Sequence, residues 1–143
     1  SDVKAQYPEV ANKARLRIGR VLIQQKKFAE AEAFFTEIID SRMEAPDKDV
    51  VAGAYLGRGL CTLSKRDATK EDNKQALFDL LRVVVSYKDV GEHQPEALYH
   101  AGKCFLLVGD KDAARRSQAL FSRLKTDWPA SIWAQKAIKE LGG

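Results

Sequence analysis

The sequence is poor in several features that mark particular classes of protein. Its 143 residues include only two cysteines, two histidines and four prolines. No apolar run approaches the roughly 18 residues that a membrane-spanning helix needs, and the most apolar stretch, residues 80–85, is interrupted by Arg82. With 45% hydrophobic and 31% charged residues, the composition is typical of a folded helical protein rather than of a disordered tail.

Charge of one sign is never concentrated along the chain. The formal net charge is +4, but lysine and arginine alternate with acidic residues and form no run of five. Nucleic-acid binding would need a coherent basic stripe, with aromatic platforms for single strands. We therefore expect a mixed-charge surface and no nucleic-acid partner.

Groups that could converge on a reaction are also scarce. His93 lies in the segment 91–94, which we expect to be exposed to solvent. His100 and Cys104 are four residues apart and could share a helix face, but a zinc site needs three or four ligands. Neither cysteine belongs to a CxxC motif, and both are expected to be buried free thiols. The sequence thus predicts no enzyme, no cofactor and no metal site.

The four prolines divide the chain into units. Each one, at positions 8, 46, 95 and 129, stands immediately before a stretch with helical periodicity, as suits a residue tolerated in a first helical turn. We predict one all-α domain over residues 1–143. It contains three helical hairpins at about 9–42, 47–87 and 94–126, and a closing helix at about 130–141.

A glycine followed by a basic residue recurs in the first helix of each unit. The pairs are Gly19-Arg20, Gly57-Arg58 and Gly102-Lys103. Glycine inside a helix costs about 1 kcal/mol relative to alanine, so its recurrence predicts that a second helix packs closely there. The predicted core faces of the first and third of these helices are Ala11, Ala14, Ile18 and Leu22, and Leu98, Ala101, Phe105 and Val108.

A second amphipathic helix follows in each unit. Its core positions are Phe28, Ala31, Phe35 and Ile38 in the first unit, Ala76, Leu80 and Val83 in the second, and Ser117, Phe121 and Leu124 in the third. Residues 83–85 would suit a strand in isolation, but the repeat frame predicts the end of a buried helix. The charged segment 64–73 is predicted to be an exposed loop, with Thr69 capping the next helix.

The last segment predicts a closing helix. Trp133, Ala134, Ala137, Ile138 and Leu141 fall toward one side of it and polar residues toward the other. This pattern is typical of a helix that caps the open end of a solenoid.

Paired helices with a period of roughly 34 to 45 residues and small residues at fixed positions resemble tetratricopeptide repeats. That family carries a Leu-Gly pair in the first helix and an alanine followed by an aromatic residue in the second. Ile18-Gly19 with Ala31 and Phe35 matches this pattern. The segment 127–134 resembles the repeat junction of bacterial envelope tetratricopeptide proteins. The resemblance implies a right-handed α-α superhelix.

The resemblance also implies a binding surface. In the family, the first helices line the concave side of the superhelix, and the residue after the glycine points into it. Three basic residues at that position would suit an acidic or carboxylate-bearing peptide; the alternative is that they only solvate an exposed groove. The predicted binding residues are Lys13, Arg17, Arg20, Tyr55, Arg58, Tyr99, His100 and Lys103.

The predicted function is therefore a non-catalytic module that binds a protein, as a peptide or helix, in this groove. The alternative is a segment of a larger solenoid or a self-associating subunit, because the sequence leaves room for further chain before Ser1 and after Gly143. Nucleic-acid binding, the third hypothesis, predicts affinity that falls steeply with salt. The compartment stays open, although the junction resemblance favours the bacterial cell envelope over the cytoplasm.

Overall fold

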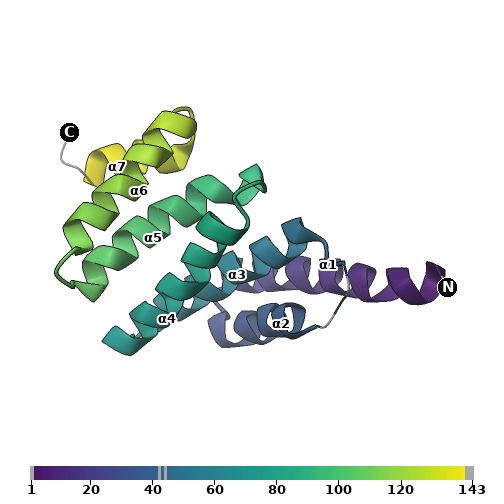
Figure 1. Ribbon diagram of the computed structural model, residues 1–143. Coiled ribbons are helices and arrows are strands. Elements are labelled where there is room, and N and C mark those ends of the chain that lie inside the picture. The colour runs from purple at the N-terminus through teal and green to yellow at the C-terminus, as the bar shows by residue number, and fades with distance from the viewer. Residues whose placement is uncertain (1, 42, 44, 141–143) are drawn as a thin grey trace.

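The computed structural model describes residues 2–41, 43 and 45–140 and is built of helices (Figure 1). No strand occurs in that part of the chain, so the predicted all-α class is confirmed. None of its helices is both long and apolar enough to cross a membrane. The elements are α1 (Asp2–Gln24), α2 (Phe28–Asp40), α3 (Lys48–Leu63), α4 (Lys70–Leu81), the turns η1 (Arg82–Ser86) and η2 (Gly91–His93), α5 (Gln94–Val108), α6 (Ala113–Asp127) and α7 (Ile132–Glu140).

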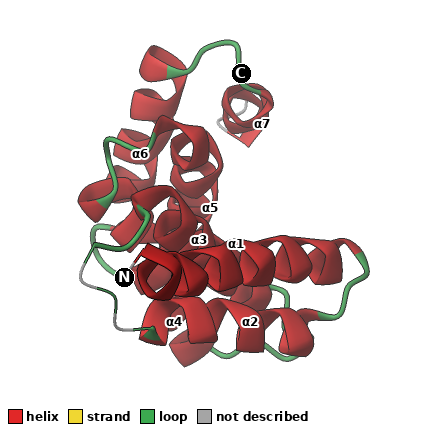
Figure 2. Cartoon of the chain, turned by 90° about the vertical axis from the view of Figure 1, so that its right-hand side faces the viewer, coloured by secondary structure: helices red, strands yellow, loops and turns green. Residues whose placement is uncertain are grey.

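Helices that follow one another in the chain pack against one another. The pairs α1–α2, α3–α4 and α5–α6 form hairpins, each hairpin packs on the next through α2–α3 and α4–α5, and α7 lies against both α5 and α6. Figure 2 shows α5, α6 and α7 standing above the level of α1, α2 and α4. The structure therefore shows repeat-like packing of neighbouring helices.

The small residues of the first helices let the second helices approach closely. A Cβ atom on Gly19 would lie 2.5 Å from Phe35 Cε1, and Gly57 faces the same ring even more tightly. Gly102 stands in the same relation to Phe121, with 2.5 Å to Cε1. The close approach predicted at the recurrent glycine is therefore confirmed at all three positions. The predicted core residues of the second helices are also confirmed. Phe28 is partly buried, and all the other residues of that set are buried.

The predicted core face of the first helix is wrong at two of its four positions, although Ala11 is half-buried and Leu22 packs against the core. Ala14 and Ile18 are exposed, whereas Asn12, Leu16 and Gly19 are buried. Both faces of this helix carry apolar residues, so periodicity alone gave the wrong one. The start of α1 was also misplaced, because the helix begins at Asp2 and contains Pro8. Proline removes one helical hydrogen bond but does not exclude a helix.

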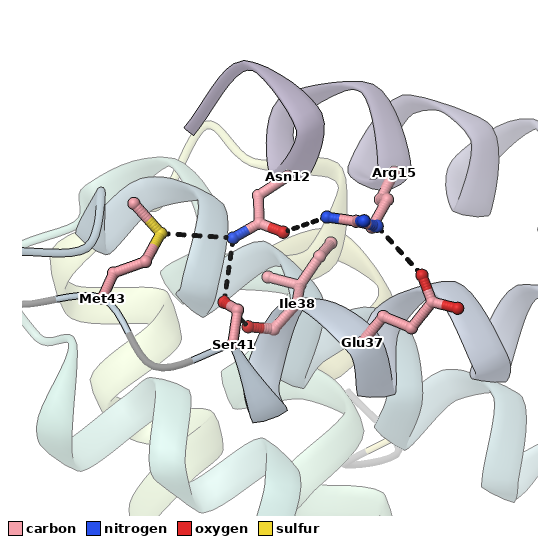
Figure 3. A network of polar contacts seen from close by, with 6 residues as sticks. All are labelled: Asn12, Arg15, Glu37, Ile38, Ser41 and Met43. Carbon is pink, nitrogen blue, oxygen red and sulfur yellow. Dashed lines mark hydrogen bonds and ion pairs between the residues drawn. The ribbon is translucent and has the colours of Figure 1, made fainter. Parts of the chain in front are cut away.

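A polar network fixes the buried face of α1 against the end of α2 (Figure 3). The Asn12 amide donates to Ser41 Oγ at 2.9 Å and to Met43 Sδ at 3.4 Å. Arg15 donates to Asn12 Oδ1 and to Glu37 Oε2, both at 2.9 Å. Asn12 is only 4% exposed, and these bonds satisfy both ends of its amide. This satisfied network explains how a polar residue can occupy the core side of α1.

The second hairpin has a shorter loop than expected. Thr69 caps α4 in a capping box with Asp72, accepting from its backbone N–H at 3.1 Å and donating to its carboxylate at 3.0 Å. This confirms the predicted cap. Because α4 begins at Lys70, the loop covers residues 64–69 and not 64–73. Val83 and Val84 are buried in the π-helical turn η1, which confirms a helical rather than a strand conformation.

Candidate functional site

A pocket opens between the first helices of the three hairpins, and we call it the central pocket. Its volume is about 320 Å³. One wall comes from α1, the floor from α3, and the opposite wall from η2 and the start of α5. The lining residues are Arg20, Ile23 and Gln24 from α1, Gly53, Leu56, Gly57 and Leu60 from α3, and Glu92, His93 and Glu96.

Opposite charges face each other across the central pocket. Arg20 stands on the α1 wall, and Glu92 and Glu96 stand on the other. Burial raises the pKa of the Glu96 carboxyl, and the positive charges of Arg20 and Lys136 partly counteract this effect. The floor between the walls is apolar, with leucine side chains and glycine backbone. The pocket is therefore amphipathic and carries both signs of charge, unlike the uniformly basic groove that the sequence predicted.

Neither Tyr55 nor Arg58 lines the central pocket; Arg58 points toward α4, and Tyr55 packs near η1. Arg58 makes a bidentate ion pair with Asp79, with Nε–Oδ2 and Nη2–Oδ1 distances of 2.9 Å. Tyr55 packs against Tyr87 with ring centroids 6.2 Å apart, and Arg58 and Arg82 both lie over its ring. Position 58 thus serves the α3–α4 contact, because the residue after Gly57 points to the second helix rather than into the pocket.

Tyr99, His100 and Lys103 lie under the closing helix. The Tyr99 hydroxyl donates to Glu140 Oε1 at 3.0 Å, and Lys103 Nζ is 3.3 Å from the same oxygen. The ring of His100 is 5.1 Å from that of Trp133. Burial, reinforced by nearby lysines, lowers the pKa of His100 to about 4. These three residues therefore hold α7 in place.

The remaining predicted residues lie on the exposed side of α1. Lys13 Nζ is 3.9 Å from Asp47 Oδ2, a solvent-exposed pair, and Arg17 is exposed. Only Arg20 of the eight predicted residues lines the central pocket. The three basic residues of the predicted stripe therefore lie in different places. Arg20 lines the central pocket, Arg58 pairs with Asp79 of α4, and Lys103 lies beside Glu140 of α7.

His93 is buried, contrary to the expected exposed loop. Its side chain is 4% exposed, and Nε2 is 3.2 Å from Asp49 Oδ1 in the first turn of α3. This contact is short, but it is not aligned as a hydrogen bond, and Nε2 has no other partner. Glu92 adds a second carboxylate, and one ligand atom from each of the three residues lies within 4.8 Å of the other two. Sequence reasoning missed this trio because Asp49 is distant in the chain.

The cysteines behave as predicted. Both are buried and free. Burial raises the pKa of the Cys61 thiol to about 12 and that of Cys104 to about 11. Cys104 donates to the Asn73 carbonyl at 3.1 Å, which points its sulfur toward α4, whereas His100 faces Trp133 on α7. The side chains of His100 and Cys104 thus contact different helices.

An apolar strip runs along the outer side of α1, and we call it the α1 stripe. Tyr7, Val10, Ile18 and Val21 are 73%, 63%, 43% and 49% exposed, and exposed Ala14 lies between them. Their spacing places them on one helix face. The stripe includes residues that the sequence had assigned to the core.

Comparison with known proteins found no relative of this chain. No family model, curated protein or solved structure matches the chain. The tetratricopeptide resemblance therefore stays a prediction.

Proposed function

We propose that the chain is a non-catalytic, tetratricopeptide-like module that binds a segment of another protein in the central pocket. The observation that carries the proposal is the pocket itself, which opens on the first helices of all three hairpins. Stacked helical hairpins supply such surfaces in repeat proteins. The close glycine–phenylalanine contacts at Gly19, Gly57 and Gly102 support the same architecture.

The lining of the pocket indicates the chemistry of the ligand. Leu56 and Leu60 on the floor favour an apolar side chain. Arg20 on one wall suits a carboxylate, and Glu92 with Glu96 on the other suits a basic group. The ligand that fits best is a short peptide with an apolar residue between an acidic and a basic one, rather than a purely acidic tail.

Selection from a random peptide display library tests this proposal and needs no candidate partner. The purified wild type should enrich a consensus with this charge pattern. The variant Arg20→Glu/Glu96→Lys should lose those peptides, because the first wall then repels the acidic residue and the second wall no longer attracts the basic one. Arg115→Glu/Glu71→Lys changes the same residue types at exposed positions on α6 and α4 and serves as the control. A consensus that binds all three proteins equally would place binding outside the central pocket.

The α1 stripe favours a second candidate function, self-association. Four large apolar side chains exposed along one helix face are typical of a surface that meets another protein. A second copy could pack its own α1 against the stripe about a two-fold axis, which is the commonest symmetry of homo-oligomers.

Sedimentation velocity distinguishes the second candidate from a monomeric binding module. Self-association predicts a dimer at high micromolar concentration that Ile18→Glu/Val21→Glu converts to a monomer. Val85→Glu, at another exposed apolar position, should leave the dimer intact. A wild type that sediments as a monomer at every concentration would exclude this function and leave the pocket proposal untouched.

A further inference from the structure

We infer that Asp49, Glu92 and His93 form a binding site for a borderline transition-metal ion such as Zn²⁺. The site joins the first turn of α3 to the turn η2, at the edge of the central pocket. Glu92 and His93 also line the central pocket, but ion binding needs no partner protein and can be tested without one.

The imidazole of His93 is buried without a hydrogen-bond partner for Nε2. A polar nitrogen that is removed from water without a hydrogen-bond partner costs free energy. His93 Nε2 is such an atom, and its side chain is 4% exposed. The imidazole is therefore held close to a carboxylate without being satisfied by it, and a bound ion would supply the missing partner.

The geometry of the contact suits a shared metal better than a hydrogen bond. Zinc bonds to nitrogen and oxygen are about 2.0–2.2 Å long, so two ligand atoms of a tetrahedral site are about 3.3 Å apart. Their lone pairs point at the metal and not at each other. His93 Nε2 and Asp49 Oδ1 are 3.2 Å apart and not aligned for a hydrogen bond. Their separation is thus close to the distance between two ligand atoms of a tetrahedral zinc site.

Glu92 supplies the third ligand. Its carboxylate has an oxygen within 4.8 Å of the other two ligand atoms, and its exposed side chain can move inward by rotation. One nitrogen and two oxygens match the three-ligand set of open zinc sites, with water in the fourth position. Because imidazole disfavours Ca²⁺ and Mg²⁺, which prefer all-oxygen sites, the donor set selects Zn²⁺ or a similar ion.

Titration of the metal-free 143-residue chain with ZnCl₂ in an isothermal calorimeter tests the site. We expect one zinc ion per chain. Glu92→Gln should weaken binding at least about tenfold, and so should His93→Gln. His100→Gln removes the other histidine of the chain and should bind zinc as the wild type does. MgCl₂ and CaCl₂ should show no binding.

Co²⁺ provides a second readout that does not depend on affinity. A visible absorption band of four-coordinate Co²⁺ should appear with the wild type and vanish with Glu92→Gln, whose side chain is exposed and whose replacement should leave the fold intact by circular dichroism. The inference would be overturned if the wild type bound no zinc. It would equally be overturned if His100→Gln abolished binding while Glu92→Gln preserved it.

Discussion

Phe35 of α2 packs so closely on Gly57 of α3 that a methyl group on Gly57 would overlap the tip of the ring. Gly57→Ala should therefore destabilise the fold by up to about 2 kcal/mol, because overpacking costs about 1–3 kcal/mol and the gain in helix propensity offsets only about 1 kcal/mol of it. Urea unfolding followed by circular dichroism measures this as a lower midpoint with an unchanged slope. Gly91→Ala is the control, since no atom lies within 4 Å of its added Cβ, and its midpoint should hardly change.

The ion pair between Arg58 and Asp79 predicts a stability effect rather than a binding effect. The side chains are only 25% and 13% exposed, so Asp79→Asn should cost about 1.5–3 kcal/mol by weakening charged hydrogen bonds. Asp112→Asn affects an exposed pair with Arg115 and should cost less than about 0.5 kcal/mol. Equal urea midpoints for the two variants would show that the α3–α4 ion pair contributes nothing.

His100 predicts a loss of stability in mild acid. The pKa of His100 in the folded chain, about 4, lies below the ordinary value of 6.5. Between these two pH values the imidazole is therefore protonated in the unfolded chain and neutral in the folded chain. Stability is complete above about pH 6.5 and falls as the pH drops toward 4, by on the order of 2–3 kcal/mol.

Replacement of His100 by glutamine should flatten that part of the pH profile. Unfolding free energies of His100→Gln and wild type are compared between pH 7.5 and pH 4, and the difference at pH 7.5 is subtracted to remove the effect of repacking. Carboxylates titrate in both proteins and cancel. Parallel profiles would contradict the buried, neutral imidazole.

The two thiols should be unreactive in the folded protein. Because burial raises the pKa of Cys61 to about 12 and of Cys104 to about 11, little thiolate forms at pH 8, and the thiolate is the reactive species. Ellman's reagent should label neither cysteine within minutes under native conditions and both after unfolding in guanidinium chloride. Rapid labelling of the native chain would mean that a thiol is accessible.

Local periodicity predicted the second helices well. Phe35, Leu80 and Phe121 lie on helices with a clear contrast between an apolar and a polar side, so the buried face could be read from spacing alone. The recurrent glycines were equally informative, because an unfavourable residue in a helix needs a packing reason. Both signals depend only on residues within one helix or hairpin.

The first helices lack that contrast, and the predicted binding residues on them lie in separate surroundings. On α3 the buried residues lie on several sides of the helix, among them Val50, Ala52, Gly53 and Thr62, so the sequence could not show that Arg58 faces α4. For the same reason Ile18 of α1 was predicted to be buried, whereas the structure buries Leu16 and exposes Ile18.

The burial of His93 depended on a neighbour far away in the chain. It lies against Asp49, which belongs to a different hairpin. The cover of α7 over His100 is likewise a tertiary contact. No local pattern in the sequence marks either residue as buried.

Helix α3 contributes to both hydrophobic clusters that the described residues form. Ala52 and Leu56 of α3 belong to the cluster that reaches α5, α6 and α7, whereas Val50, Ala54 and Cys61 belong to the cluster with α1 and α2. If either cluster came apart, α3 would therefore lose the packing contacts of its residues in that cluster. Although repeat proteins can unfold unit by unit, the N-terminal hairpin here cannot open without weakening its neighbour. The backbone amides of α3 should consequently exchange with solvent more slowly than those of any other helix, at a rate set by cooperative opening of the whole chain.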